Sequence, residues 1–75
     1  MNQKEFIEII KRKRISLMLS QKEIAKSIPI SKSAYCKIEN HLQSPSFFVI
    51  RRLAELFDFD LNRIKEPTRT IIYFD

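Results

Sequence analysis

Residues 20–40 read SQKEIAKSIPISKSAYCKIEN, and this stretch decides the fold. Ser20 and Glu23 have the spacing of a capping box, in which each side chain binds the backbone amide of the other residue at a helix start. Pro29 ends that helix after about two turns, because proline has no N–H and clashes with the preceding turn. Ser31 is placed to cap the next helix. The stretch therefore predicts two short helices joined by a tight break.

The second of these helices, predicted over residues 32–40, has an apolar side and a polar side. At about 100° per residue, Tyr35 and Ile38 fall on the side that can pack against the preceding helix. The opposite side carries two long cations and two small side chains, namely Lys32, Ser33, Cys36 and Lys37. Lysine donates to guanine and serine pairs with several base edges, so this side suits a DNA groove. A solvated surface helix has the same pattern, so the wheel alone leaves both interpretations open.

A capped helix is predicted before this stretch. Asn2 and Glu5 indicate a helix start, and the apolar spacing that follows predicts a helix over residues 3–16. Its inward face is expected to comprise Phe6, Ile9, Ile10 and Leu17.

A fourth and a fifth helix are predicted after this stretch. Ser44 or Ser46 can cap the fourth helix, since Pro45 is accepted in a helix's first turn. Its apolar stripe consists of Val49, Ile50, Leu53, Ala54, Leu56 and Phe57. A short fifth helix over residues 61–65 ends before Pro67.

The C-terminal residues 67–75 differ in character from the rest. They are β-branched and aromatic, and they predict a strand or an extended arm attached to a domain of residues 1–66. Such an apolar strand is an aggregation hazard unless something covers it. We expect it to pair with its mate in a dimer, or to fold back on the first or fifth helix. With a spare aromatic ring on the fourth helix, the predicted dimer interface comprises Phe48, Ile71, Tyr73 and Phe74.

Composition limits the 75 residues to one domain and excludes most enzyme classes. The chain has no glycine, which excludes a phosphate-binding loop, a dinucleotide fingerprint and a nucleophile elbow. One histidine and one cysteine do not assemble a structural zinc site. We therefore expect no catalytic residue, no metal and no cofactor. No apolar run is long enough for a membrane span, no secretory signal is evident, and a single cysteine favours a reducing compartment, so we expect a cytoplasmic protein.

The net charge of +5 lies entirely in the first part of the chain. Residues 1–44 carry nine basic and four acidic side chains, whereas residues 45–75 carry five of each. An excess of basic side chains confined to one part of the chain suits a polyanionic partner, such as nucleic acid or an anionic membrane surface. The alternative interpretation is that the charge has no partner and only keeps the protein surface soluble.

From Arg14 to Ile64 the chain resembles the lambda repressor/Cro (Xre) family of helix-turn-helix DNA-binding domains. The residues that match at the family's spacing are Arg14, Leu19–Ala25, Ser31, Ala34–Tyr35, Ile38–Asn40, Pro45–Ser46, Leu53–Phe57 and Leu61–Ile64. The resemblance implies an all-α domain of five helices, here followed by the C-terminal arm. It also implies that the third helix lies in the DNA major groove and the second across the backbone.

The resemblance further implies which side chains meet DNA. Lys32, Ser33 and Lys37 match positions that usually touch bases. The positions expected at the phosphate backbone are Ser20, Gln21, Ser31 and Asn40. The family pairs a cation on the first helix with an anion at the end of the third, which here implies a structural ion pair between Arg14 and Glu39.

Four helix ends depart from the family's usual glycine, at Met18, Pro29, His41 and Asp58. Glycine is usual there because a positive φ costs it nothing. Asp58 tolerates that conformation moderately and Met18 poorly, whereas Pro29 cannot adopt it. We therefore expect the turn before the third helix to differ in detail from the family's turn.

These observations predict a small homodimeric transcription regulator, expected to be a repressor, that binds double-stranded DNA at a palindromic operator. Its size suggests a regulator of the phage, plasmid or mobile-element type. The alternative is a protein-interaction module or antitoxin that mainly binds a protein partner through the aromatic arm and the fourth helix. An enzyme is not expected, because the composition offers no pocket with a perturbed acid or nucleophile.

Overall fold

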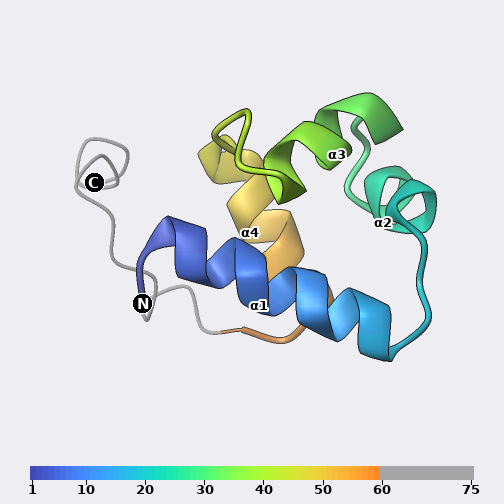
Figure 1. Cartoon of the computed structure of the whole chain (residues 1–75), viewed down its shortest axis with the longest axis horizontal. Helices are drawn as coiled ribbons and strands as arrows, with labels where there is room; N and C mark the ends of the chain where they lie inside the picture. The colour runs from blue at the N-terminus through green and yellow to red at the C-terminus, as the bar shows by residue number, and fades with distance from the viewer. Residues whose placement is uncertain (60–75) are drawn as a thin grey trace.

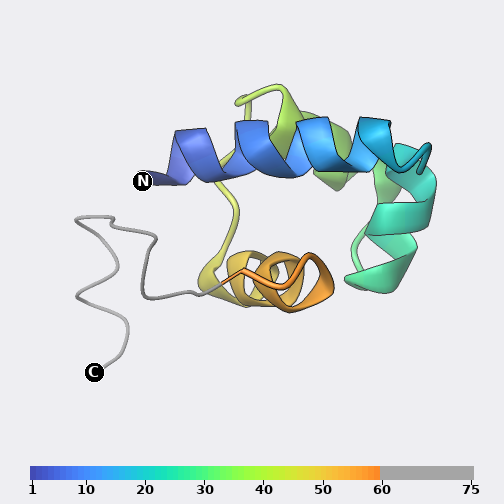
Figure 2. The same cartoon turned by 90° about the horizontal axis from the view of Figure 1, so that it is seen from below.

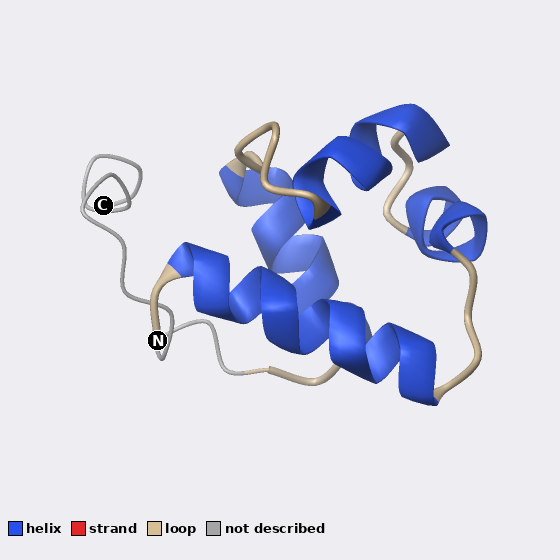
Figure 3. Ribbon diagram, viewed as in Figure 1, coloured by secondary structure: helices blue, strands red, loops and turns tan. Residues whose placement is uncertain are grey.

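The computed structural model describes residues 1–59, which form four helices joined by short loops (Figure 1). The helices are α1 (Gln3–Ser16), α2 (Gln21–Ser27), α3 (Lys32–Glu39) and α4 (Phe47–Leu56). Within this range there are helices and loops and no strand (Figure 3), which confirms the all-α prediction there. The predicted fifth helix at 61–65 and the arm at 67–75, with Ile71, Tyr73 and Phe74, lie outside the described residues. None of the four helices is both long and apolar enough to cross a bilayer.

Polar side chains cap the starts of the four helices. Asn2 Oδ1 accepts from the amide of Glu5 at 2.8 Å, and Glu5 Oε1 accepts from the amide of Asn2 at 2.9 Å. Ser20 and Glu23 form the same reciprocal pair at the start of α2. The cap of α4 is Ser46, so the proline before it lies outside the helix. Each cap satisfies an amide that has no partner inside its helix, and together they define where the helices begin.

Three helices of the described chain end at a non-glycine residue with positive φ. Met18, His41 and Asp58 have φ of 60°, 60° and 58°. After each of them, the next amide donates to a carbonyl five residues earlier, as Leu19 does to Arg14 at 3.0 Å. This is the Schellman type of helix end, in which glycine usually occupies the left-handed position. A side chain there costs on the order of 1 kcal/mol, so these three ends retain the glycine conformation at some expense in stability.

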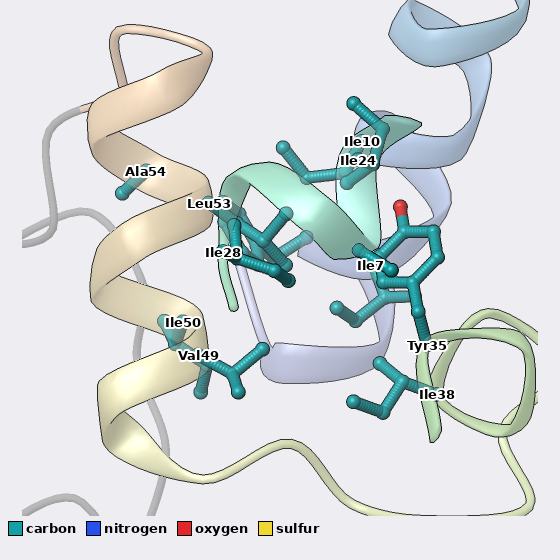
Figure 4. Packing of buried hydrophobic residues seen from close by; sticks show 12 residues of the cluster. Ile7, Ile10, Ile24, Ile28, Tyr35, Ile38, Val49, Ile50, Leu53 and Ala54 are labelled. Carbon is teal, nitrogen blue, oxygen red and sulfur yellow. The ribbon is translucent and has the colours of Figure 1, made fainter. Parts of the chain in front are cut away.

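The interior is apolar and is built from all four helices (Figure 4). Its buried members are Phe6, Ile7, Ile10, Ile24, Ala25, Ile28, Tyr35, Ile38, Val49, Ile50, Leu53 and Ala54. Figure 2 shows α1 and α4 on opposite sides of this interior, with α2 at one end. Beyond α4 the chain returns to α1, where the ring of Phe59 meets Phe6 edge-on with centroids 5.4 Å apart. Burial of apolar surface between the helices is therefore what holds α2 and α3 in place.

Two residues predicted to face inward are exposed, namely Leu17 and Leu56. Leu17 is the C-cap of α1, so it lies past the regular turns and its place on the helical wheel no longer applies. Leu56 shares its side of α4 with the exposed Arg52, four residues earlier. Ile7, which the predicted spacing did not include, is buried instead.

Candidate nucleic-acid interface

The polar side of α3 is open to solvent. Lys32, Ser33 and Lys37 are exposed, and we call these three residues the α3 ridge. Tyr35 and Ile38, on the other side of the same helix, are buried in the interior. Figure 1 shows α3 at an outer edge of the molecule, with α2 next to its first turn. The structure therefore presents two cations and a hydroxyl on the outward side of α3, whose opposite side is buried in the core.

The turn between α2 and α3 departs from the glycine form, as expected from the proline. Pro29 has no amide and is not among the residues with positive φ in the described chain. Ile30 nevertheless donates to the carbonyl of Ala25 at 3.0 Å and closes the end of α2. The hydroxyl of Ser31 then accepts from the amide of Ala34 at 3.0 Å and begins α3. The break between the helices is thus short and hydrogen-bonded on both sides.

The residues predicted to meet phosphate lie at the ends of α2 and α3. The hydroxyls of Ser20 and Ser31 each accept from a helix amide, which leaves the hydroxyl proton of each free to donate to a ligand. Asn40 is the C-cap of α3, and its Nδ2 donates to Cys36 Sγ at 3.4 Å. These two serines and Asn40 are exposed. The fourth residue of this group, Gln21, has a different environment.

A buried polar network joins Gln21 to Arg14 and Glu39. Arg14 Nε donates to Glu39 Oε2 at 2.7 Å, and Arg14 Nη2 donates to Glu39 Oε1 at 3.0 Å. Gln21 Nε2 donates to the same Oε1 at 3.0 Å. Arg14 Nη1 donates to the carbonyl of Leu19 at 2.8 Å. Because these groups belong to α1, to the start of α2 and to the last residue of α3, the network fixes the three helices relative to one another.

The charges in this network stabilise each other. Burial disfavours the ionised carboxylate of Glu39 and raises its pKa, but the hydrogen bonds from Arg14 and Gln21 outweigh burial, so the pKa falls below its ordinary value. The hydrogen bond to Glu39 in turn raises the pKa of Arg14. The pair is therefore ionised at neutral pH, and its role is to position α3.

Tyr35 lies next to this network. In the described chain its Oη is the buried side-chain oxygen without a hydrogen-bond partner. Burial raises the pKa of Tyr35, and the nearby carboxylate of Glu39 raises it further, so the hydroxyl stays protonated. Figure 4 shows its ring among the apolar side chains of the interior. Tyr35 is thus a core residue that anchors α3 from its inward side.

Sequence reasoning missed a second contact between α1 and the end of α3. His41 Nε2 lies 2.6 Å from Glu8 Oε2, although 33 residues separate the two side chains. The hydrogen bond with His41 lowers the pKa of Glu8 below its ordinary value. No local pattern connects residues so far apart in the chain. The one available signal was a histidine at a helix end where glycine is usual.

The described residues hold no group of histidine, cysteine, aspartate and glutamate side chains able to bind a metal ion.

Two short helices held at a fixed angle, the second with a basic outward side, define a helix-turn-helix domain. The model of the helix-turn-helix family matches residues 10–64, and the chain belongs to this lambda repressor/Xre-like family of DNA-binding regulatory domains, which are generally not enzymes. No curated protein and no solved structure matches the chain.

Proposed function

We propose that the protein is a sequence-specific transcription regulator that binds a palindromic double-stranded operator as a homodimer and represses by occupying it. The observation that carries this proposal is the α3 ridge, which is exposed while the opposite side of the same helix is buried. Membership of a DNA-binding family supports DNA as the partner.

The ridge residues Lys32, Ser33 and Lys37 are the proposed base contacts. In the major groove, lysine amines donate to guanine O6 and N7, and a serine hydroxyl pairs with several base edges. The proposed backbone contacts are Ser20, Gln21, Ser31 and Asn40, which lie at the ends of α2 and α3. The side chain of Gln21 already donates one hydrogen to Glu39, so its second amide hydrogen is the one proposed to reach phosphate.

Selection of bound sequences from random duplex DNA tests this proposal, followed by affinity measurements at one fixed salt concentration. The double variant Lys32→Ala/Lys37→Ala is expected to lose roughly tenfold or more in specific affinity, because each good base contact contributes about 1–3 kcal/mol. The matched control Lys4→Ala/Arg12→Ala removes the same charge from exposed positions on α1 and is expected to lose much less. Equal losses in the two variants, or a wild type without sequence preference, contradict the proposal.

The homodimer is proposed to form through Phe48 together with Ile71, Tyr73 and Phe74 of the predicted arm. Phe48 supports this, because its ring is exposed on α4. Two third helices related by a dyad would read half-sites roughly 34 Å apart. Light scattering over a range of concentrations should show a dimer for the wild type and a monomer for Phe48→Ser and for a chain without residues 67–75. An unchanged dimer mass in both variants excludes this interface.

A protein-binding role is the second candidate, and exposed apolar side chains favour it. Leu17 and Leu56 are exposed, and both line one surface hollow with Phe57. Because Lys13, Ser16 and Asp58 complete the lining, a ligand for this hollow would be a segment of a partner protein with both apolar and polar side chains. The same random-DNA selection separates the two functions, because a partner-binding module has no need of sequence preference.

A further inference from the structure

His41 closes the end of α3 and contacts α1 at the same time. It has a φ of 60°, and its amide donates to the carbonyl of Ile38 at 3.1 Å. The next amide, of Leu42, donates to the carbonyl of Lys37 at 2.8 Å. The imidazole reaches in the other direction, and its Nε2 lies 2.6 Å from Glu8 Oε2 on α1. The backbone bonds close α3, and the side chain attaches the closed end to α1.

Met18 provides an internal comparison for His41. Both residues have a φ of 60° at a helix end where glycine would fit without cost. Met18 is 91% exposed, whereas the side chain of His41 is directed to a carboxylate on another helix. The two positions therefore share a backbone conformation and differ in what the side chain does.

We propose that His41 is a positioning residue for DNA binding: its contact with Glu8 holds the end of α3 and the following loop against α1, and protonation of His41 strengthens that contact and raises DNA affinity. This inference rests on the proposed function of the α3 ridge. The ridge residue Lys37 lies one turn before His41, and its carbonyl accepts the hydrogen bond that closes the loop. The position of His41 is thereby coupled to the position of the ridge.

The chemistry of the contact depends on the charge of the imidazole. A protonated ring forms an ion pair with the carboxylate, whereas a neutral ring forms a hydrogen bond without the charge on the donor. The hydrogen bond with His41 lowers the pKa of Glu8. Glu8 therefore stays ionised over the range in which histidine side chains change charge, and its contribution is lost only as the pH falls through its lowered pKa.

Charged groups on α1 favour the ionised form of Glu8. Besides His41, the charges of Lys11 and Arg12 lower the pKa of Glu8. Lys4 lines the same surface hollow as His41. Removal of Glu8 would thus leave the imidazole without its carboxylate partner, and its protonation would then no longer strengthen the attachment of the loop.

The charged groups on the other elements near His41 are few. The last turn of α3 carries Lys37 and Glu39, and Glu39 is held in the buried network with Arg14. The first turn of α4 carries no charged side chain. Within the described chain, Glu8 is therefore the carboxylate positioned to respond to protonation of His41.

The test compares DNA affinity near pH 5.5 and near pH 8.0, at constant ionic strength and on the selected operator. The wild type is expected to bind about threefold more tightly at the lower pH, as suits a partly exposed ion pair. Glu8→Gln is expected to lose this pH dependence. Glu5→Gln is the matched control, because it removes one charge from the same helix, preserves the capping box and should retain the wild-type pH dependence.

The outcomes of this test separate positioning from direct contact. A pH dependence that persists or grows in Glu8→Gln means that protonated His41 acts on the DNA phosphate itself, and it overturns the positioning role. A wild type that binds its operator equally at both pH values also overturns it. A wild type without any preferred DNA sequence instead overturns the proposed function, and the role of His41 in DNA binding with it.

Thermal unfolding without DNA measures the contact by itself. Met18→Gly is expected to raise the melting temperature by about 4 °C, because glycine fits the left-handed position. His41→Gly has the same backbone advantage but loses the contact with Glu8. Its melting temperature should therefore rise less than that of Met18→Gly, and the difference between the two variants should be larger near pH 5.5 than near pH 8.0. Equal gains for the two variants at both pH values show that the contact contributes nothing, and they overturn the inference independently of DNA.

Discussion

Two polar contacts join α1 to the end of α3, and they differ in burial. In the first, the side chains of Arg14 and Glu39 are 11% and 1% exposed. In the second, the side chains of His41 and Glu8 are 30% and 45% exposed. Water and salt screen the second pair strongly and the first hardly at all. The same two helices are thus joined by one buried contact, which water and salt hardly weaken, and by one partly exposed contact, which they weaken strongly.

The two contacts differ in residue type as well as in burial. Arginine keeps its charge at every physiological pH, so a buried arginine–carboxylate pair is a permanent part of the scaffold. Histidine changes charge near neutral pH, so a histidine–carboxylate pair responds to the medium. The following predictions test the buried contact and its network and then an exposed pair on α4, beginning with the largest expected effect.

Arg14→Ala should cause the largest loss. We expect the free energy of unfolding to fall by about 3–5 kcal/mol, because Glu39 would remain buried without its charged partner. Urea unfolding followed by circular dichroism measures this change. Arg12→Ala is the control, since it removes an exposed arginine of the same helix and should change stability by less than about 0.5 kcal/mol. Similar losses of unfolding free energy in the two variants would show that the buried pair stabilises the fold no more than an exposed arginine does.

Acid should destabilise the fold through Glu39. Its pKa in the folded chain lies below the ordinary value of 4.5, so its stabilising effect is complete above that value and is lost as the pH falls through the folded pKa. Urea unfolding between about pH 7 and pH 3 should show this decline, on the order of 1 kcal/mol or more. In Glu39→Gln the decline should be shallower, although Glu8 and Glu23, whose pKa values are also lowered, still contribute to it. An identical decline in both proteins would exclude Glu39 as a main source.

Gln21→Ala should have an intermediate effect on stability. Its amide donates to the buried carboxylate of Glu39, and a hydrogen bond to a charged group contributes about 1.5–3 kcal/mol. Thermal and urea unfolding of the free protein measure the loss, with Lys22→Ala on the exposed neighbour as control. If Gln21 acted on DNA alone, the variant would unfold like the wild type and only its affinity would fall.

Arg52→Ala should have the smallest effect. Arg52 Nη1 lies 3.7 Å from Glu55 Oε1 on the same helix, and both side chains are well exposed. Exposed pairs of this kind contribute at most about 0.5 kcal/mol, so the unfolding midpoint should hardly move. A loss as large as that of Gln21→Ala would mean that burial does not separate the strong contacts of this protein from the weak ones.

Helix boundaries and the outward side of α3 follow from local pattern. The first helix was expected over residues 3–16 and is found at Gln3–Ser16, because a capping box acts within four residues of a helix start. The third was expected over residues 32–40 and is found at Lys32–Glu39, with Asn40 as its C-cap. The exposure of the α3 ridge also agrees with the helical wheel, which depends on nothing beyond the helix itself.

Contacts between distant segments needed the packed structure. Gln21, which was predicted at the phosphate backbone, belongs to the buried network, and the side chain of His41 is found against Glu8 on α1. Leu17 has the spacing of a core residue and is exposed, because α1 ends before it. Periodicity and caps report on residues within a turn or two of one another, whereas the environments of Gln21 and His41 depend on where helices from different parts of the chain are placed. That placement is determined by how the apolar side chains of all four helices fill a shared interior.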